Sequence, residues 1–395
     1  MNQQGDKMQC TPHNWTDRQH IDSLTGARFF AIMIIVFSHF EFLRQYGQFG
    51  EVYWRYFHNA TMGVDFFFML SGFGMMLSSI RRDPCGLLPI GGIPELINYG
   101  KRHIRKIYPV YVVFLLIGIP YYLFTGYFEY GHPLCNQIAK SAVFFFFDLT
   151  LLQSATGHAS FSHSLNGVCW FLSTLFCIYL ISPIIIKTIK RHIKSIKHNL
   201  ICLMFSVLLS FLLSFLFSWV DDHTPFNDLC YGSPYRRVFY VIQGMLIAQI
   251  YNAFCNDNTL RFPVFISTGA FEHSFFCFSL LWFFLRFSFQ SVLGHFTCVI
   301  DMIVVSGDLF ALAVNSGKIS KIFSNKKLVF LGEISMYIFL SHYNIRMYID
   351  LIVRSLGLES LAVAFIEVVS IIILTMITSV AIQYFRTNSN RNLKV

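Results

Sequence analysis

The segment RFFAIMIIVFSH places an arginine and a histidine eleven residues apart, Arg28 and His39. In a helix, eleven residues cover three turns plus about 20°, so both side chains lie on one face and about 16 Å apart along the axis. Imidazole suits general-base catalysis because its pKa lies near neutral pH, and a guanidinium holds anionic groups. The pair predicts a base at one end of a helix and an anion site at the other. Two interfacial anchors on a single span are the alternative.

A second segment, GVDFFFMLSGF, puts the carboxylate of Asp65 at the head of a strongly apolar run. A carboxylate within a membrane costs on the order of 2.5–3.5 kcal/mol on insertion scales, so it needs water or a partner. Two roles stay open for Asp65: it orients His39 or the acceptor as a carboxylate orients a catalytic imidazole, or it caps the start of the helix. Farther along, Ser71 and Gly72 allow close helix contact. Gly72 shares a helix face with Asp65, seven residues earlier.

The basic segment KRHIRKIYP carries Arg102 and Arg105 one helical turn apart. Two guanidinium forks at this spacing match the oxygens of phosphate groups. The alternative is a basic stretch that only sets membrane topology.

Several other polar side chains, at the extracytoplasmic ends of apolar segments, are candidates for a site that binds the acceptor of a reaction. Trp170 and Ser173 begin one segment, and His342 lies in another. Arg236 and Arg237 stand at an outer helix end against the positive-inside bias, where they could hold a phosphate or an acidic sugar. The alternatives are an aromatic belt residue, helix packing and snorkelling to lipid headgroups.

The composition indicates what kind of protein must position these residues. The chain has 395 residues, 55% hydrophobic and only 13% charged, against about 25% charged in soluble domains. Long apolar runs from end to end predict a multi-span membrane protein. The net charge of +9 lies in blocks beside these runs, so it indicates topology rather than nucleic-acid binding. The ten cysteines form no CxxC, so no metal site is expected; a disulfide between Cys135 and Cys230 stays open.

Charged loops determine how the apolar runs cross the membrane. The basic loops 81–106 and 187–198 should both be cytoplasmic, yet three runs lie between them. The shortest run, 138–152, contains Lys140 and Asp148 and spans only about 22 Å as a helix. We therefore expect it to be re-entrant or interfacial. The prediction is an all-α polytopic protein with about ten transmembrane helices plus this segment, and both termini cytoplasmic. The runs are 24–43, 61–80, 107–124, 138–152, 168–186, 200–220, 236–254, 263–287, 291–314, 328–349 and 361–385.

We divide the chain accordingly into a cytoplasmic tail at 1–23, a membrane domain at 24–385 and a cytoplasmic tail at 386–395. The first apolar run is too long for a cleaved signal peptide and lacks a small-residue cleavage site, so we expect it to be a retained span.

Taken together and in this order, the segments resemble the acyltransferase-3 family of bacterial membrane O-acyltransferases. The resemblance rests on Arg28-x10-His39, GVDFFFMLSGF, the Arg102-x-x-Arg105 pair followed by IYP, WFLS at 170–173 and GEISMYIFLSH at 332–342. It covers nearly the whole chain. One departure stands out: many members carry a carboxylate pair after the segment equivalent to WFLS, whereas here Thr174, Leu175 and Phe176 follow.

The resemblance implies transfer of an acyl group, above all acetyl, from cytoplasmic acyl-CoA to a hydroxyl of an extracytoplasmic glycan such as O-antigen, capsule or exopolysaccharide. It implies a place in the bacterial inner membrane, acetyl-CoA or another acyl-CoA as co-substrate, and a glycan or lipid-linked glycan as acceptor. His39 would be the catalytic histidine, with Asp65 beside it. Arg28, Arg102 and Arg105 would serve the acyl donor or the architecture of the site.

Two other functions compete with this interpretation. A proton-coupled transporter would use intramembrane carboxylates, and Asp301 and Asp308 share one helix face, with Glu333 and Glu367 as further candidates. A non-catalytic scaffold would keep the packing motifs without His39. The combination of Arg-x10-His with GVDFFFMLSGF favours the enzyme over both.

Overall fold

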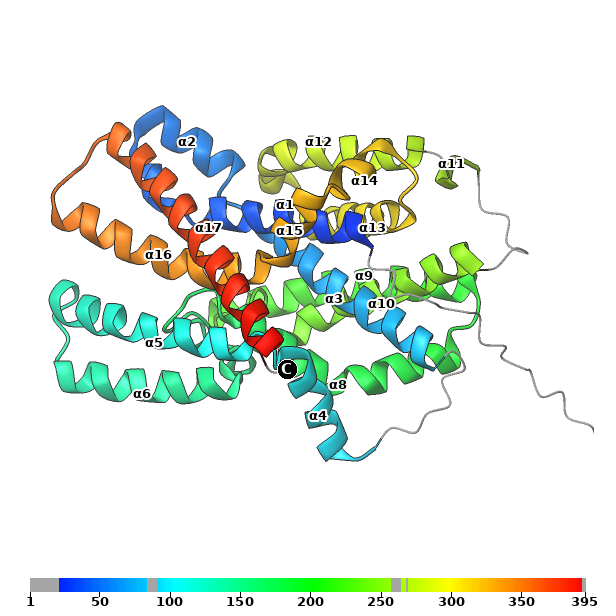
Figure 1. Ribbon diagram of the computed structural model, residues 1–395, viewed down its shortest axis with the longest axis horizontal. Coiled ribbons are helices and arrows are strands. Elements are labelled where there is room, and N and C mark those ends of the chain that lie inside the picture. The colour runs from blue at the N-terminus through cyan, green and yellow to red at the C-terminus, as the bar shows by residue number, and fades with distance from the viewer. Residues whose placement is uncertain (1–20, 84–90, 257–263, 268, 393–395) are drawn as a thin grey trace, which may run out of the picture.

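The computed structural model describes residues 21–83, 91–256, 264–267 and 269–392, and the regular structure in this part of the chain is entirely helical (Figure 1). The predicted all-α class is confirmed. The helices are α1 (Asp22–Ser38), α2 (Gly47–Tyr56), α3 (Thr61–Arg82), α4 (Ile93–Ile104), α5 (Tyr108–Phe124), α6 (Leu134–Thr150), α7 (Ala159–Ser162), α8 (Trp170–His192), α9 (Ile196–His223), α10 (Pro234–Asn256), α11 (Val264–Ser267), α12 (Gly269–Leu293), α13 (Thr297–Val314), α14 (Lys318–Phe323), α15 (Lys326–Glu333), α16 (Ser335–Ser355) and α17 (Leu361–Asn392).

Eight helices in the described ranges are long and apolar enough to cross a membrane, or nine if the bent pair α15 and α16 is one span. The predicted span 24–43 is not among these helices. In that region α1 ends at Ser38 after 17 residues, about 25 Å, which is shorter than a membrane span. A short 3-10 helix follows at Glu41–Gln45. The Tyr53 hydroxyl donates to the carbonyls of Phe37 (3.0 Å) and Ser38 (3.2 Å), which satisfies main-chain acceptors that the end of α1 leaves free.

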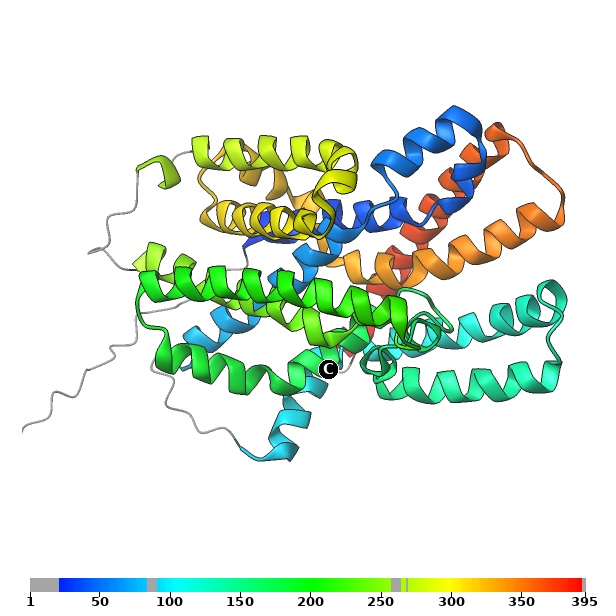
Figure 2. The same cartoon turned by 180° about the vertical axis from the view of Figure 1, so that it is seen from behind.

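The predicted re-entrant segment 138–152 lies mainly in α6, which runs beside α5 as a helical hairpin (Figures 1 and 2). The hydroxyl of Tyr111 in α5 donates to the carbonyl of Asp148 at 2.8 Å and ties the two helices together. With 17 residues, α6 is too short to count among the candidate spans. Its re-entrant or interfacial placement stays a prediction.

The most extensive helix contact joins α3 to α10. A Cβ atom on Gly72 would lie 1.9 Å from the carbonyl oxygen of Val241, and one on Gly244 would lie 1.8 Å from that of Met69. Only glycine fits at either position, so the expected close contact at Gly72 is confirmed. Because Asp65 shares the face of Gly72, α10 also meets this carboxylate.

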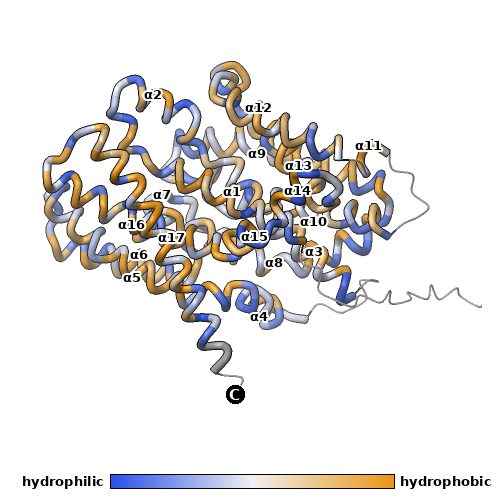
Figure 3. Tube along the Cα trace, turned by 45° about the horizontal axis from the view of Figure 1, so that its top comes forward, coloured by the Kyte–Doolittle hydropathy of each residue, from blue (hydrophilic) through white to orange (hydrophobic). Residues whose placement is uncertain are grey.

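The surface of the bundle is apolar, as lipid contact requires. In α9 the small residues Ser206, Ser210 and Ser214 are buried against the bundle, whereas Met204 and Phe205 are exposed. This arrangement reverses the pattern of a soluble helix and lets helices approach closely. Colouring by hydropathy shows apolar residues along most long helices and more polar stretches in α2 and α4 (Figure 3).

The bent pair α15 and α16 follows α1 from one end toward the other. A Cβ on Gly332 of α15 would lie 1.7 Å from the carbonyl oxygen of Thr25, so α15 packs directly on the start of α1. After a break of 58°, α16 carries His342 to the end of α1, beside His39.

Candidate active site

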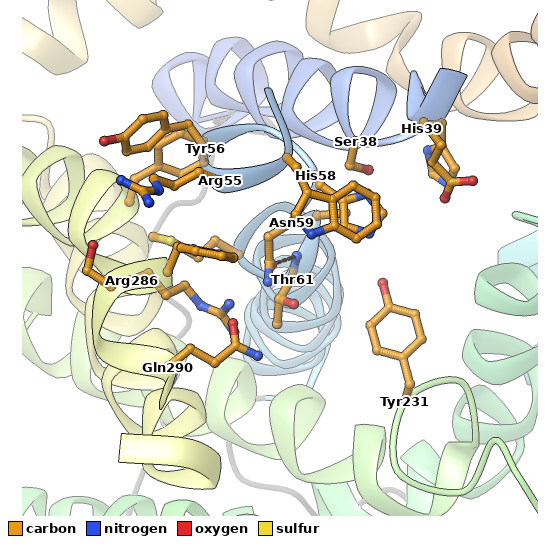
Figure 4. A pocket seen from close by; sticks show the side chains of 17 residues that line it. Ser38, His39, Arg55, Tyr56, His58, Asn59, Thr61, Tyr231, Arg286 and Gln290 are labelled. Atoms are coloured by element: carbon orange, nitrogen blue, oxygen red, sulfur yellow. Dashed lines mark hydrogen bonds between the residues drawn. The ribbon is translucent and has the colours of Figure 1, made fainter. Parts of the chain in front are cut away.

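A cavity of about 940 Å³ lies where α1 ends, and we call it the histidine-end cavity (Figure 4). His39 forms part of its wall, together with residues from the α1–α3 connection, the segment before α10 and the end of α12. Its polar and aromatic lining consists of Ser38, His39, Glu41, Trp54, Arg55, Tyr56, His58, Asn59, Thr61, Tyr231, Phe283, Arg286, Phe287, Ser288 and Gln290.

The hydrogen bonds of His39 determine its tautomer. Its Nδ1 lies 2.7 Å from the carbonyl oxygen of Ile35, which can only accept a hydrogen bond. Nδ1 of the neutral ring therefore carries the proton, and Nε2 keeps a free lone pair. None of the described residues hydrogen-bonds to Nε2 of His39, so this nitrogen can act as a base.

His342 supports the same assignment from the opposite side. Its Nδ1 lies 3.0 Å from the Ile338 carbonyl oxygen, which leaves its Nε2 as an acceptor. That Nε2 lies 3.4 Å from Nδ1 of His39. Fully buried, His342 thus occupies the position that a carboxylate takes behind the imidazole of a catalytic triad. The Tyr343 ring, 5.4 Å from that of His39 in an edge-on contact, limits its rotation further.

A second cavity, of about 790 Å³, lies at the start of α1, and we call it the arginine-end cavity. Arg28, Arg81, Arg82 and Arg102 line it with Tyr99 and His103. Within the described part of the chain, neither a hydrogen bond nor an ion pair holds the guanidinium of Arg28; its electrostatic neighbours are Glu333 and Tyr179. Four guanidinium groups around one cavity form a site for a multiply charged anion.

The two arginines of the Arg-x-x-Arg pair lie at different places around α4. Arg102 lines the arginine-end cavity and also a neighbouring cavity of about 990 Å³. Arg105, the residue that ends α4, lines only the neighbouring cavity, with Lys101. The guanidinium groups of Arg102 and Arg105 therefore both line this neighbouring cavity.

Aromatic side chains also pack against the histidine pair. Phe67 contacts Phe171 at 6.2 Å between ring centroids, and Phe171 contacts Phe339 at 5.3 Å. Phe339 in turn lies 6.1 Å from the ring of His342. This aromatic column ends at the histidine pair.

We compared the amino-acid sequence of the chain with those of known protein families. The family described as acyltransferase 3, with the description "Acyltransferase domain", matches residues 21–384. The chain belongs to this family. It is therefore a membrane-bound acyltransferase with many apolar helices, and an acyl donor and an acceptor are its substrates. No curated protein and no solved structure gives a significant match.

In this acyltransferase, Asp65 does not contact His39, and the interpretation in which it orients that ring is wrong in this structure. Its Oδ1 accepts a hydrogen bond from Nη1 of Arg237 at 2.6 Å, and both side chains are fully buried. The guanidinium of Arg237 also lies within 5.0–5.9 Å of the ring centroids of Phe68, Trp170, Tyr231 and Tyr240. Asp65 thus balances a buried charge between α3 and α10.

The structure places most of the proposed acceptor residues in packing roles. Trp170 belongs to the aromatic cage around Arg237, which is itself 0% exposed and out of reach of an acceptor. Arg236 donates to the Cys230 carbonyl at 2.8 Å and to the Tyr240 hydroxyl at 2.7 Å. Of the five candidates, only His342 touches His39.

Ser173, the remaining acceptor candidate, is also committed to structure. Its hydroxyl donates to the Leu151 carbonyl at 2.9 Å and accepts from the Ser154 hydroxyl at 2.8 Å. These bonds attach the short 3-10 helix Gln153–Thr156 to the start of α8. Ser173 is therefore a packing residue of the acyltransferase.

Two of the four carboxylates that suggested a transporter have structural partners. Asp301 pairs with Arg286 at 2.8 Å, and Asp308 accepts from the Ser279 hydroxyl at 2.6 Å. Glu333 is exposed near the start of α1, and Glu367 lines a separate cavity of about 660 Å³. They form no continuous chain of titratable groups of the kind that proton relays use.

Sequence reasoning overlooked two groups of the acyltransferase's cavity residues. Arg286 lies in a strongly apolar run, and an intramembrane arginine is by itself a reason to expect a site. Trp54 comes from α2 and His58 from the segment just after it, both between the predicted runs 24–43 and 61–80; their spacing of four residues is the available signal. Cys135 and Cys230 are both free thiols, so the open disulfide does not form. Metal-binding clusters of three or more His, Cys, Asp or Glu are absent from the described ranges.

Proposed function

We propose that this acyltransferase moves an acyl group, in the first place acetyl, from cytoplasmic acyl-CoA to a hydroxyl of an extracytoplasmic glycan or lipid-linked glycan at the bacterial inner membrane. One observation carries the proposal. A single helix, α1, has a cavity lined by four arginines at its start and a cavity containing a free imidazole nitrogen at its end. A donor that stays inside can thereby serve an acceptor that stays outside.

The donor binds at the arginine end in this proposal. CoA is polyanionic, and its phosphates match the forks of Arg82 and Arg102 and the guanidinium of Arg28, which no ion pair holds within the described ranges. Arg105 and Lys101 extend the positive charge into the neighbouring cavity. The arginine end thus holds the anionic part of the donor in place.

The pantetheine arm then bridges the two ends. From Arg28 to His39 is about 16 Å along α1, close to the length of the extended arm. Where the arm reaches the histidine end it meets the aromatic column of Phe67, Phe171 and Phe339, which ends at His342. These rings must move apart to admit the arm, so donor binding includes a conformational step.

The chemistry takes place at Nε2 of His39. This nitrogen removes the proton from the acceptor hydroxyl as the oxygen attacks the thioester carbonyl. The carbon–sulfur bond of the tetrahedral intermediate then breaks, and the thiolate of CoA leaves and takes the proton back from His39. The products are a glycan ester and free CoA. In an alternative mechanism, Nε2 of His39 attacks the thioester carbonyl first, and the acyl-His39 intermediate then transfers the acyl group to the acceptor hydroxyl.

The test compares the surface glycans of cells that contain the protein, lack it or carry His39→Ala, by NMR and mass spectrometry. We expect an ester-linked acyl group that requires the protein and disappears with His39→Ala. The control is His132→Ala, which removes an exposed histidine of the α5–α6 connection. Identical acylation in all four strains would refute the proposal, and the mass of the group would identify the acyl chain.

A further inference from the structure

The wall of the histidine-end cavity across from His39 contains an arginine that is fixed in place. Nε of Arg286 donates to both carboxylate oxygens of Asp301, at 3.0 and 2.9 Å, and its Nη2 donates at 2.8 Å. Asp301 also accepts from Nε1 of Trp282 at 2.7 Å. These bonds leave Nη1 of Arg286 without a protein acceptor in the described ranges. Figure 4 shows the guanidinium beside Gln290, with His39 on the other side of the cavity.

Arg55 adds a positive charge to the same cavity. It is exposed at the end of α2, and no ion pair holds its guanidinium within the described ranges. It lies over the ring of Phe287, 5.7 Å from the centroid, which keeps it at the α12 side of the cavity. The acidic residue of the lining, Glu41, is 4.0 Å from Arg346. The cavity therefore has positive charge that no lining residue neutralises.

An aromatic platform stands beside this charge. The rings of Trp54 and His58 stack at 3.5 Å with an angle of 16°, and the guanidinium of Arg44 lies 4.0 Å from the ring of Trp54. Tyr56 and Tyr231 contribute further aromatic surface to the lining. His58 and Arg44 cover the two faces of Trp54, so His58, Tyr56 and Tyr231 supply the aromatic surface that a sugar ring can meet. Such a surface next to polar donors fits a sugar ring, which has an apolar face and a rim of hydroxyls.

We propose that the acceptor is an anionic glycan, in an inference that rests on the function proposed above. Its carboxylate or phosphate binds Nη1 of Arg286 and the guanidinium of Arg55, and an adjoining sugar ring packs near Trp54 and His58. This arrangement presents a hydroxyl to Nε2 of His39 across the cavity. The anion comes either from an acidic sugar or from the phosphate that joins a glycan to its lipid carrier.

A purely structural role explains less of this arrangement. An ion pair between α12 and α13 needs Arg286 and Asp301 only, and it gives no reason for an unpaired Arg55 or for a stacked Trp54 and His58 at the same cavity. Bidentate pairing also holds the guanidinium plane in one orientation, which is a property of sites that recognise planar anions.

The experiment measures kcat/KM of the purified full-length protein with acetyl-CoA and two matched pairs of acceptors. The first pair is an oligosaccharide containing a uronic acid and the same oligosaccharide after reduction of its carboxyl groups. The second pair is a saccharide linked through diphosphate to a polyprenyl lipid and the free saccharide. Loss of a charge-assisted hydrogen bond should lower kcat/KM for the neutral member by roughly 10- to 100-fold. The pair that shows this preference identifies the source of the anion.

Variants then connect the preference to the two arginines. Arg55→Gln should bring the ratio of kcat/KM for the charged and the neutral acceptor toward one. The control Lys140→Gln, which removes an exposed charge on α6, should leave this ratio unchanged. Arg286→Lys keeps a positive charge opposite Asp301, so folding is retained, but it loses the planar fork. We expect it to reduce the preference as well.

The outcomes separate this inference from the proposed function. Equal rates with charged and neutral acceptors overturn the anionic acceptor and leave acyl transfer in place. A preference that survives both Arg55→Gln and Arg286→Lys also overturns it. Absence of transfer to all four acceptors, by protein that binds acetyl-CoA, would instead count against the glycan acyltransferase itself.

Discussion

The two cavities at the ends of α1 differ in how their charges are balanced. At the arginine end, four guanidiniums surround one space and Arg28 has no ion-pair partner among the described residues. At the histidine end, Arg286 is paired with Asp301, and His39 is fixed by Ile35 and His342. The arginine end gathers four guanidiniums around one cavity, whereas the histidine end combines Arg55 with oriented groups that have few degrees of freedom.

This difference corresponds to what each substrate requires. In the proposed function, the polyanionic acyl-CoA is held by total charge and its reacting thioester lies far from the phosphates, so the arginine end has no need of fine geometry. Proton transfer requires a base within hydrogen-bond distance and in the correct tautomer, and the histidine end provides this by pairing its polar groups. Variants at the two ends should therefore fail in different ways.

The largest effect is expected from His39→Ala. Loss of a positioned general base lowers kcat by about 10²- to 10⁴-fold, whereas the affinity for acyl-CoA at the arginine end should not change. Turnover and donor binding, measured on the same purified protein, test this split. A variant that loses donor binding together with turnover would contradict the separation of the two ends.

The Asp65–Arg237 pair should affect both ends together, because it joins α3 to α10 in the centre of the bundle. Removing one partner of a buried ion pair leaves an uncompensated charge and costs about 3–5 kcal/mol of stability. We expect Asp65→Leu and Arg237→Met each to lower the thermal midpoint in detergent.

The double variant Asp65→Leu/Arg237→Met is the control, since replacing a whole buried pair by apolar groups is often neutral. It should recover most of the stability. A double variant as unstable as the sum of the two single variants would show that the charges themselves, and not the uncompensated partner, are what the fold needs.

These predictions also show how far the sequence alone leads. The common face of Arg28 and His39 and the close contact at Gly72 follow from helix periodicity. The structure confirms the contact at Gly72, and α1 connects the two cavities that Arg28 and His39 line. Periodicity determines neighbours along one helix. It could therefore place the arginine and histidine ends of α1 correctly.

Contacts between helices distant in the sequence lie beyond this kind of argument. Asp65 meets Arg237 172 residues later, and His39 meets His342 303 residues later. The sequence predicts Asp65 and His39 at the same depth, and one of the two roles left open for Asp65 rests on that shared depth alone. Depth in the membrane says which residues share a level, and packing decides which of them touch.

Among the residues of the arginine end, Arg28→Gln should raise KM for acyl-CoA by roughly 10- to 100-fold, because it removes a charge-assisted contact to phosphate. The value of kcat at saturating donor should change little. The matched control is Arg191→Gln, an exposed arginine near the end of α8 that lines neither cavity. An effect on kcat alone would place Arg28 in the chemical step and remove the contrast between the two ends.

At the histidine end, His342→Ala should lower kcat by roughly 2- to 10-fold, the worth of one neutral hydrogen bond to Nδ1 of His39. His342→Gln keeps an acceptor and should recover part of the loss. Because His342 is a positioning residue, the pH profile of kcat should shift in His342→Ala and return toward the original in His342→Gln. Equal losses in both variants, with an unchanged pH profile, would indicate a packing role only.

The smallest effect concerns a histidine in the segment between α7 and α8. His163 lies 3.7 Å from Asp228, in the segments before α8 and before α10. Burial lowers the pKa of His163, but the hydrogen bond and charge of Asp228 outweigh burial and raise this pKa above its usual value. A raised pKa in the folded state means that the pair stabilises the fold fully below about pH 6.5, the unfolded value. This contribution is lost as pH rises through the folded pKa.

Because His163 is partly exposed, solvent screening limits the contribution to a few tenths of a kcal/mol. The difference in thermal midpoint between the original protein and His163→Gln should therefore be largest in mild acid and vanish in mild alkali. The segment 226–233 carries Tyr231 to the histidine-end cavity, so KM for the acceptor should follow the same trend while KM for acyl-CoA does not. A parallel change in both constants would mean that the two ends of α1 are coupled through the bundle rather than independent.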